Sequence, residues 1–190
     1  MYTRGSFQNL LSYPALGLLE CTGIARGMLT CDAIVKRANV QLIQSHPIDP
    51  GRYIILFEGL VAEVEEGLDA GELAAGDMLL DKLFLPQVHS AVVPSIRGQM
   101  PLPPLMSLAI VETHTIATAV VALDASLKTA QTRAVEIRLG SGIAGKGYFV
   151  ISGELYDVQA AVEAAIDTVG SDIITEVIAS PHPDFLKRSF

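Results

Sequence analysis

The chain has 190 residues, a formal net charge of −8 and no cluster of Lys or Arg. Half of its residues are hydrophobic and only 18% are charged. This composition excludes intrinsic disorder, and it argues against a nucleic-acid partner because binding a phosphate backbone requires several positioned cations. The scarcity of charge fits either an oligomer with buried surface or two efficient cores, and composition does not decide between them.

No membrane segment and no disulfide framework are expected. The first 12 residues lack the basic-then-apolar pattern of a secretory signal, and no apolar run approaches the ~18 to 20 residues that span a bilayer. The two cysteines, Cys21 and Cys31, do not have the spacing of metal ligands. These features predict a soluble protein of a reducing cytoplasm.

The sequence contains two copies of one design. Residues 15–38 match residues 107–130 at an offset of 92, with eight identities in 24 positions. From Gly51 and Gly145 onward the offset becomes 94, so the second copy has two extra residues. Because loops accept insertions at low cost, we expect the extra residues to lie in a loop.

Each copy is predicted to run β-α-β-β-α-β. Residues 15–21 form the nearly continuous apolar run of a strand that is buried on both faces, and apolar residues then recur at helical spacing. In the first copy the expected strands are residues 15–21, 40–45, 53–57 and 79–85, and the expected helices are residues 24–38 and 61–75. In the second copy the expected strands are residues 108–113, 133–139, 148–152 and 173–178, and the expected helices are residues 116–129 and 155–169.

The order of elements predicts an α+β fold made of two tandem domains with the ferredoxin-like order β-α-β-β-α-β. We expect the helices to pack on one face of a mixed sheet in each domain. The first domain is predicted over residues 14–97 and the second over residues 107–190. A Pro-rich linker over residues 98–106 joins them, because proline disfavours both helix and central strand.

Two stretches resemble the bacterial microcompartment shell domain. The first is Ala-Leu-Gly-Leu-Leu-Glu at residues 15–20, followed by Asp32-Ala-Ile-Val-Lys36-Arg-Ala-Asn-Val-Gln-Leu. The second is Arg138-Leu-Gly-Ser-Gly142, continued by Ile-Ala-Gly-Lys, which resembles the pore loop of that family. The resemblance covers about residues 14 to 185 in two copies and is nearest to the non-permuted tandem shell proteins of propanediol-utilisation-like microcompartments.

This resemblance implies a structural subunit in the shell of a bacterial microcompartment in the cytoplasm. It implies a homotrimer whose six domains form a flat pseudohexagon that tiles with other shell proteins. It also implies an axial pore for small-molecule metabolites, lined by Pro47, Ile48, Asp49 and Pro50 of the first copy and by Gly140, Ser141 and Gly142 of the second.

Asp49 is the residue of greatest interest in these loops. Taken alone, an Asp between Ile and Pro is most often a turn residue that bonds its own backbone, and a Gly-Ser-Gly turn without a pore is equally common. Three-fold symmetry would instead place three carboxylates in one channel, which favours cations and polar neutral solutes over anions.

In some relatives a Cys in the first pore loop of each of three chains holds an iron–sulfur cluster. Here Asp49 stands at that position, and such clusters need thiolate ligands. We therefore expect no cofactor and no metal site. The resemblance also places Lys36 and Lys128 at the edge between neighbouring hexagons, where each would pair with the matching Lys and with backbone groups of a neighbour.

No catalytic constellation is visible, and an enzyme is not expected. No Ser/His/Asp or Cys/His set can be assembled, and Glu20 and Glu112 are interpreted as structural residues at the ends of strands. The alternative to a shell subunit is a small-molecule sensor or regulatory protein, because tandem ferredoxin-like domains often bind metabolites between subunits. A sensor would be a small oligomer that its ligand stabilises.

Overall fold

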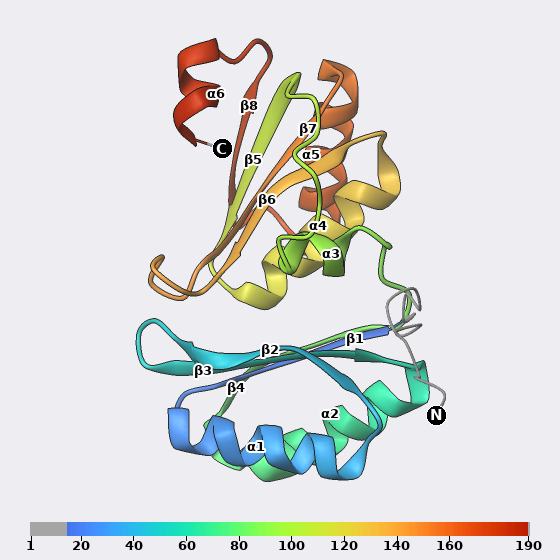
Figure 1. Cartoon of the computed structure of the whole chain (residues 1–190), viewed down its shortest axis with the longest axis vertical. Coiled ribbons are helices and arrows are strands. Elements are labelled where there is room, and N and C mark those ends of the chain that lie inside the picture. The colour runs from blue at the N-terminus through green and yellow to red at the C-terminus, as the bar shows by residue number, and fades with distance from the viewer. Residues whose placement is uncertain (1–14, 190) are drawn as a thin grey trace, which may run out of the picture.

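The computed structural model describes residues 15–189, which form two copies of one α+β domain in tandem (Figure 1). The first comprises β1 (Ala15–Cys21), α1 (Ile24–Arg37), β2 (Gln41–Ile48), β3 (Arg52–Gly59), α2 (Val61–Ala75), the 3₁₀ turn η1 (Gly76–Met78) and β4 (Leu79–Leu85), and α3 (Val92–Ile96) follows. The second comprises β5 (Ser107–Thr113), α4 (Ile116–Thr129), β6 (Arg133–Leu139), β7 (Gly147–Gly153), α5 (Leu155–Val169), β8 (Ile173–Ile178) and α6 (Pro183–Ser189). The predicted fold class and the order of its elements are confirmed, while the short helices α3 and α6 were not predicted.

Each domain has a four-stranded sheet, in the orders β2-β3-β1-β4 and β6-β7-β5-β8. Every neighbouring pair of strands is antiparallel, so the prediction of a mixed sheet is wrong. The connection through α1 makes β1 and β2 parallel, but these two strands are not neighbours in the sheet. Strand β3 lies between them and is antiparallel to both, and the same arrangement recurs in the second domain.

The strand register shows how the two copies correspond. Leu18 pairs with Leu56 in the first sheet, and Ile110 pairs with Val150 in the second, which reproduces the offsets of 92 and 94. Leu16 pairs with Leu85, whereas its counterpart Leu108 pairs with Ile178. The last strands are therefore offset by 93, because a register shift beside Glu20 gives β4 one more residue than β8.

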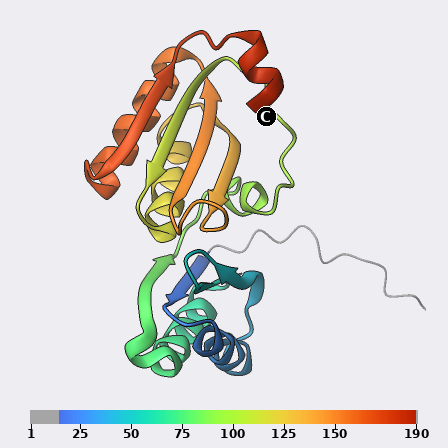
Figure 2. The same cartoon turned by 90° about the vertical axis from the view of Figure 1, so that its left-hand side faces the viewer.

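The first sheet lies between two layers of structure. Helices α1 and α2 cover one of its faces, and the second domain lies over the other (Figures 1 and 2). Along β1, Leu16 and Leu18 belong to the core shared with the second domain, while Leu19 and Cys21 belong to the core under α1 and α2. Both faces of β1 are covered, which explains its unbroken apolar sequence.

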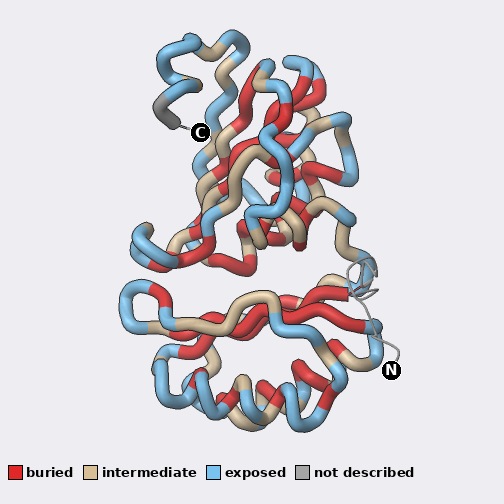
Figure 3. Tube along the Cα trace, in the orientation of Figure 1, coloured by how far each residue is buried: buried red, intermediate tan, exposed pale blue. Residues whose placement is uncertain are grey.

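The largest core of the chain spans both domains. It joins side chains of the first sheet to α4 and to the sheet of the second domain, and its members include Ile48, Ile54, Leu56, Ile116, Val120 and Leu123. Figure 3 shows α4 buried along much of its length, whereas the outer side of α1 is exposed. Burial of apolar area at this junction fixes how the domains sit on each other.

Helices lie very close to the sheets at two corresponding points. A Cβ added to Gly27 in α1 would lie 2.3 Å from the Cβ of Tyr53, so only glycine fits there. In the second domain the small residue lies on the strand instead, since a Cβ on Gly147 would lie 2.5 Å from the Cβ of Ala119 in α4. Both copies therefore pack helix and strand closely at this point, but the glycine lies on the helix in the first domain and on the strand in the second.

Between the domains, residues 99–106 form neither helix nor strand. Before them, α3 packs on β6 and α4, and it buries Val92, Val93 and Ile96 in the shared core. The segment that follows the first sheet is therefore anchored on the second domain. Among residues 15–189, no helix is long and apolar enough to cross a membrane.

Candidate pore site

Two hairpin loops, one from each domain, lie on the same side of the junction between the domains (Figure 1). Residues 49–51 join β2 to β3, and residues 140–146 join β6 to β7. The backbone N–H of Gly142 donates a hydrogen bond to Oδ2 of Asp49 at 2.7 Å. The structure therefore brings together Asp49 and the Gly-Ser-Gly turn, which are 93 residues apart in sequence.

Glycines let the second loop lie against the first. Gly140 has a φ of +78°, and a Cβ there would lie 2.9 Å from both Ile48 and Ile116. Gly145 also has a φ of +78°, and a Cβ there would lie 2.8 Å from the carbonyl oxygen of Asp49. Positive φ and lack of space both require glycine at these two positions.

The structure divides the seven predicted pore residues into two groups. Exposed are Pro47, Asp49, Pro50, Ser141 and Gly142. Ile48 and Gly140 are buried, and Ile48 is only 4% exposed because its side chain packs in the core between the domains. The exposed five residues can contact a solute, while Ile48 and Gly140 support the loops from behind.

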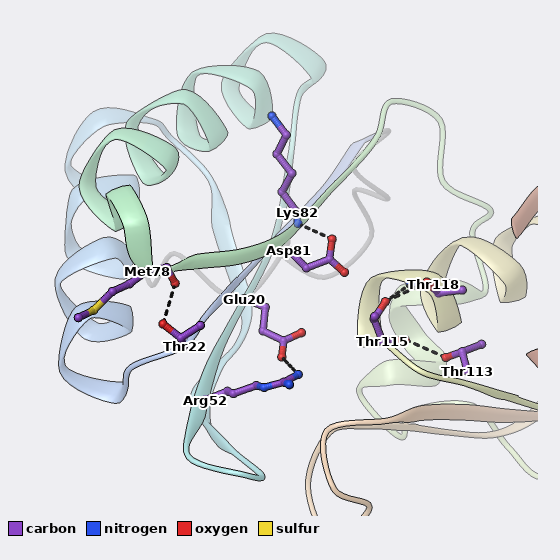
Figure 4. Close-up of polar contacts among 9 residues, drawn as sticks. All are labelled: Glu20, Thr22, Arg52, Met78, Asp81, Lys82, Thr113, Thr115 and Thr118. Carbon is purple, nitrogen blue, oxygen red and sulfur yellow. Dashed lines mark hydrogen bonds and ion pairs between the residues drawn. The ribbon is translucent and has the colours of Figure 1, made fainter. Parts of the chain in front are cut away.

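An ion pair lies directly behind each loop. Arg52 Nη1 lies 2.9 Å from Oε1 of Glu20, which is completely buried. Lys146 pairs with Glu112 at the corresponding place, but the Glu112 side chain is 38% exposed. Glu20 and Asp81 lie opposite each other on β1 and β4, on the side of the first sheet that faces the start of α4 (Figure 4). The sequence interpretation of Glu20 and Glu112 as structural missed their partners. The signal was present, since a cation follows each Glu in corresponding positions.

Burial dominates the electrostatics of Glu20. Loss of solvent raises the pKa of the Glu20 carboxyl above its ordinary value. The hydrogen bond and the charge of Arg52 lower this pKa, whereas the charge of Asp81 raises it further. Oε2 of Glu20 is buried and has no hydrogen-bond partner among the described residues. The pair therefore holds β1 to β3 at an electrostatic cost.

The loop residues do not fit a thiolate-bound iron–sulfur cluster. Cys21 is buried at the end of β1, where burial raises the pKa of its thiol, and Cys31 lies in α1. His46 lies near the first loop, but its Nδ1 is 2.9 Å from the carbonyl oxygen of Pro47. Within residues 15–189, no three His, Cys, Asp or Glu side chains gather into a group that could hold a metal ion.

Lys36 and Lys128 lie at corresponding positions near the ends of α1 and α4. Lys36 Nζ lies 2.5 Å from Oδ2 of Asp32, and Lys128 Nζ lies 2.6 Å from Oδ2 of Asp124. Lys128 also donates to the carbonyl oxygen of Gln87, which follows the first sheet. Their surroundings differ, because the Lys36 side chain is 72% exposed and that of Lys128 is 44% exposed.

Comparison with known proteins assigns this architecture to a family. The family model of the BMC domain matches residues 15–88 and again residues 107–181. The chain therefore belongs to the BMC domain family and carries two of its domains in tandem. The resemblance seen in the sequence is confirmed.

Individual relatives agree with this assignment. The bacterial microcompartment shell protein PduT of Citrobacter freundii is 37% identical over 177 residues, which cover 92% of this chain and 96% of that protein. A crystal structure of a microcompartment protein from Desulfitobacterium hafniense is 39% identical, with a TM-score of 0.87 over 93% of this chain and 99% of the other. The fused permuted hexameric shell protein of the RMM microcompartment shares the fold, with a TM-score of 0.59 and 20% identity over 81% of this chain and 80% of the other.

Proposed function

We propose that this chain, a structural subunit of a bacterial microcompartment shell, assembles as a trimer whose six domains surround a pore for small polar metabolites. Its BMC domains and its similarity to the shell protein PduT over most of both chains support the shell role. The role is structural rather than catalytic. In the shell it tiles beside other shell proteins, and its net charge of −8 disfavours binding to nucleic acid.

The observation that carries the pore assignment is the hydrogen bond between Gly142 and Asp49. It ties together two loops that come from different domains but occupy equivalent places in the repeat. A ring of three chains would present these loops alternately around its axis. Pro47, Asp49, Pro50, Ser141 and Gly142 would then line the opening, with Ile48 and Gly140 beneath them.

Asp49 gives this pore its charge. Asp49 is exposed, and only one of its carboxylate oxygens bonds to Gly142. Arg52 and Lys146 behind the loops are each paired with a glutamate, so the carboxylate of Asp49 is not neutralised by them. Three such carboxylates around one axis would attract cations and repel anions.

Lys36 and Lys128 would serve the shell edge. Lys128 uses two N–H groups on Asp124 and Gln87, and its remaining N–H can reach outward, since 44% of the side chain is exposed. Lys36, which pairs with Asp32 and has a side chain that is 72% exposed, would give each trimer a second cationic contact along its rim. Neighbouring tiles could accept them with backbone carbonyl groups.

The charge of the pore can be separated from its shape by one substitution. Asp49→Asn keeps a side-chain oxygen that can accept from Gly142 but removes the charge. A unit charge 4 Å away in water is worth about 1 kcal/mol, so loss of three charges should lower the ratio of cation to anion influx by at least about tenfold. Influx is measured in assembled shells loaded with a fluorophore that iodide or thallium(I) quenches.

The matched control is Asp69→Asn, which removes an exposed carboxylate from α2. This variant should leave both quenching rates unchanged. Asp49→Ala, which also removes the acceptor for Gly142, should additionally alter the total influx because the loops are no longer tied together. If Asp49→Asn leaves the ratio of the two rates at the wild-type value, Asp49 does not select solutes.

A further inference from the structure

Each domain is followed by a short arm that carries a helix. The first arm, residues 86–97, contains α3, and the C-terminal arm, residues 179–187, leads into and contains most of α6. The last strands are offset by 93, and at that offset His89 corresponds to His182 and Gln87 corresponds to Ser180. The two arms are thus a further part of the internal repeat.

The two arms share one turn around their histidines. The N–H of Ala91 points to Nδ1 of His89 at 3.2 Å, and the N–H of Asp184 points to Nδ1 of His182 at 3.2 Å. The carbonyl oxygen of each histidine also accepts the N–H of the third residue after it, at 3.0 Å in both arms. The C-terminal arm therefore begins with the same turn at His182 that the bound first arm has at His89.

The first arm is held on α4 of the second domain. The N–H of His89 donates to Oδ1 of Asp124 at 2.7 Å, and Nζ of Lys128 donates to the carbonyl oxygen of Gln87. Asp124 and Lys128 are themselves an ion pair one turn apart on α4. Behind these polar contacts, Val92 and its apolar neighbours in α3 join the shared core.

Helix α1 carries the same binding elements without a cover. Asp32 and Lys36 form the same ion pair as Asp124 and Lys128, at 2.5 Å against 2.6 Å. Their exposure differs sharply, because the Asp32 side chain is 53% exposed and that of Asp124 is 7% exposed. On the adjacent strand, Leu42 is 37% exposed, whereas its counterpart Ala134 is 3% exposed and lies in one core cluster with the residues of α3.

The C-terminal arm of the same chain does not lie at this site. Helices α6 and α1 lie at opposite ends of the chain in both views (Figures 1 and 2). We propose that the C-terminal arm docks on α1 of a second copy of this chain. The N–H of His182 donates to Asp32 of the second copy, and Lys36 of that copy donates to the carbonyl oxygen of Ser180. Each chain then gives one arm and accepts one, which closes a ring without unused ends.

This inference rests on the proposed trimer, and hydrogen–deuterium exchange of residues 180–187 tests it in the full chain, with sedimentation reporting the oligomer mass. In the wild-type trimer the arm amides should be protected. Asp32→Ala removes the acceptor, so the amide of His182 should exchange at least about tenfold faster, and each interface should weaken by about tenfold. Asp69→Ala, on the exposed side of α2, should behave as wild type.

The possible results separate the two proposals. A wild-type chain that stays monomeric overturns both of them. A wild-type trimer with rapidly exchanging arms, or an Asp32→Ala trimer with full protection and unchanged affinity, overturns the docking alone. Protection that appears only when a different shell protein is added also overturns it, because the arm would then fit another partner. A chain that ends at Ala179 provides a second check, since it should weaken the trimer at least as much as Asp32→Ala.

Discussion

Ile24 and Ile116 are the first residues of α1 and α4, and they occupy equivalent positions in the repeat. Ile116 is completely buried, while Ile24 is 38% exposed. The same residue type at the same helical position therefore differs in what covers it. Substitution of Ile116 by alanine measures the stability that contacts within the chain contribute at this position. Substitution of Ile24 by alanine measures the stability that contacts between chains contribute.

The size of the effect follows from burial. Ile116 packs beside Ile48 and Gly140 at the junction of the domains, so Ile116→Ala should leave a cavity and lower the free energy of unfolding by about 2 to 5 kcal/mol. Ile24→Ala loses less buried area and gains helix propensity. In the isolated chain it should cost no more than about 1 kcal/mol.

Urea unfolding at several protein concentrations distinguishes the two losses. The loss caused by Ile116→Ala should be independent of concentration, because the contact lies within one chain. The loss caused by Ile24→Ala should grow as concentration rises, because a trimer stabilises the folded chain only when chains are associated. A large, concentration-independent loss for Ile24→Ala would refute the reasoning, since its outer face would then be covered within its own chain.

Three further substitutions test single features of the fold. Gly27→Ala places a Cβ against Tyr53 and should lower the free energy of unfolding by about 1 to 3 kcal/mol in urea titrations. Burial raises the pKa of Glu20 above 4.5, so the folded chain binds this proton more tightly than the unfolded chain does. The free energy of unfolding should therefore fall as pH rises from 4.5 through the raised pKa. Glu20→Gln lacks this effect, and the difference in unfolding free energy between variant and wild type should shift in favour of the variant from pH 4.5 to 7. Gly145→Ala strains a backbone with φ of +78° against the carbonyl of Asp49, and exchange of the Gly142 amide should accelerate while the sheets keep their protection.

The helices and strands of both domains could be predicted because their signals are local and occur twice. The predicted bounds of α2, α4 and α5 agree with the structure to the residue. Helices α3 and α6 escaped prediction because they are short. Each has a proline within its first residues and too few turns to show an apolar period. What orders α3 is its contact with the second domain, which is not encoded in the segment itself.

The loops show the same limit. The sequence indicated that residues near 49 and 141 belong to corresponding turns, but it did not indicate that the turns touch. The resemblance to the shell domain places Ile48 among the pore-lining residues. In the structure it points into the core instead, since side chains alternate along a strand and Ile48 is the last residue of β2. The hydrogen bond between Asp49 and Gly142 depends on the packing of two domains, which local patterns do not contain.

The divergence of α1 from α4 is what the proposed assembly requires. The linker keeps α4 beside the first domain at any protein concentration, so its contact face can be largely apolar around the buried Asp124. Helix α1 must tolerate water until another chain arrives. It carries Met28, which is 53% exposed, where α4 has the fully buried Val120. It also carries Val35, which is 43% exposed, where α4 has Leu127, which is 6% exposed. A duplicated domain whose helices served only the core under their own sheet would have no reason to differ in this way. These differences fall on positions that α4 buries and α1 exposes, which supports the proposed boundary between chains at α1.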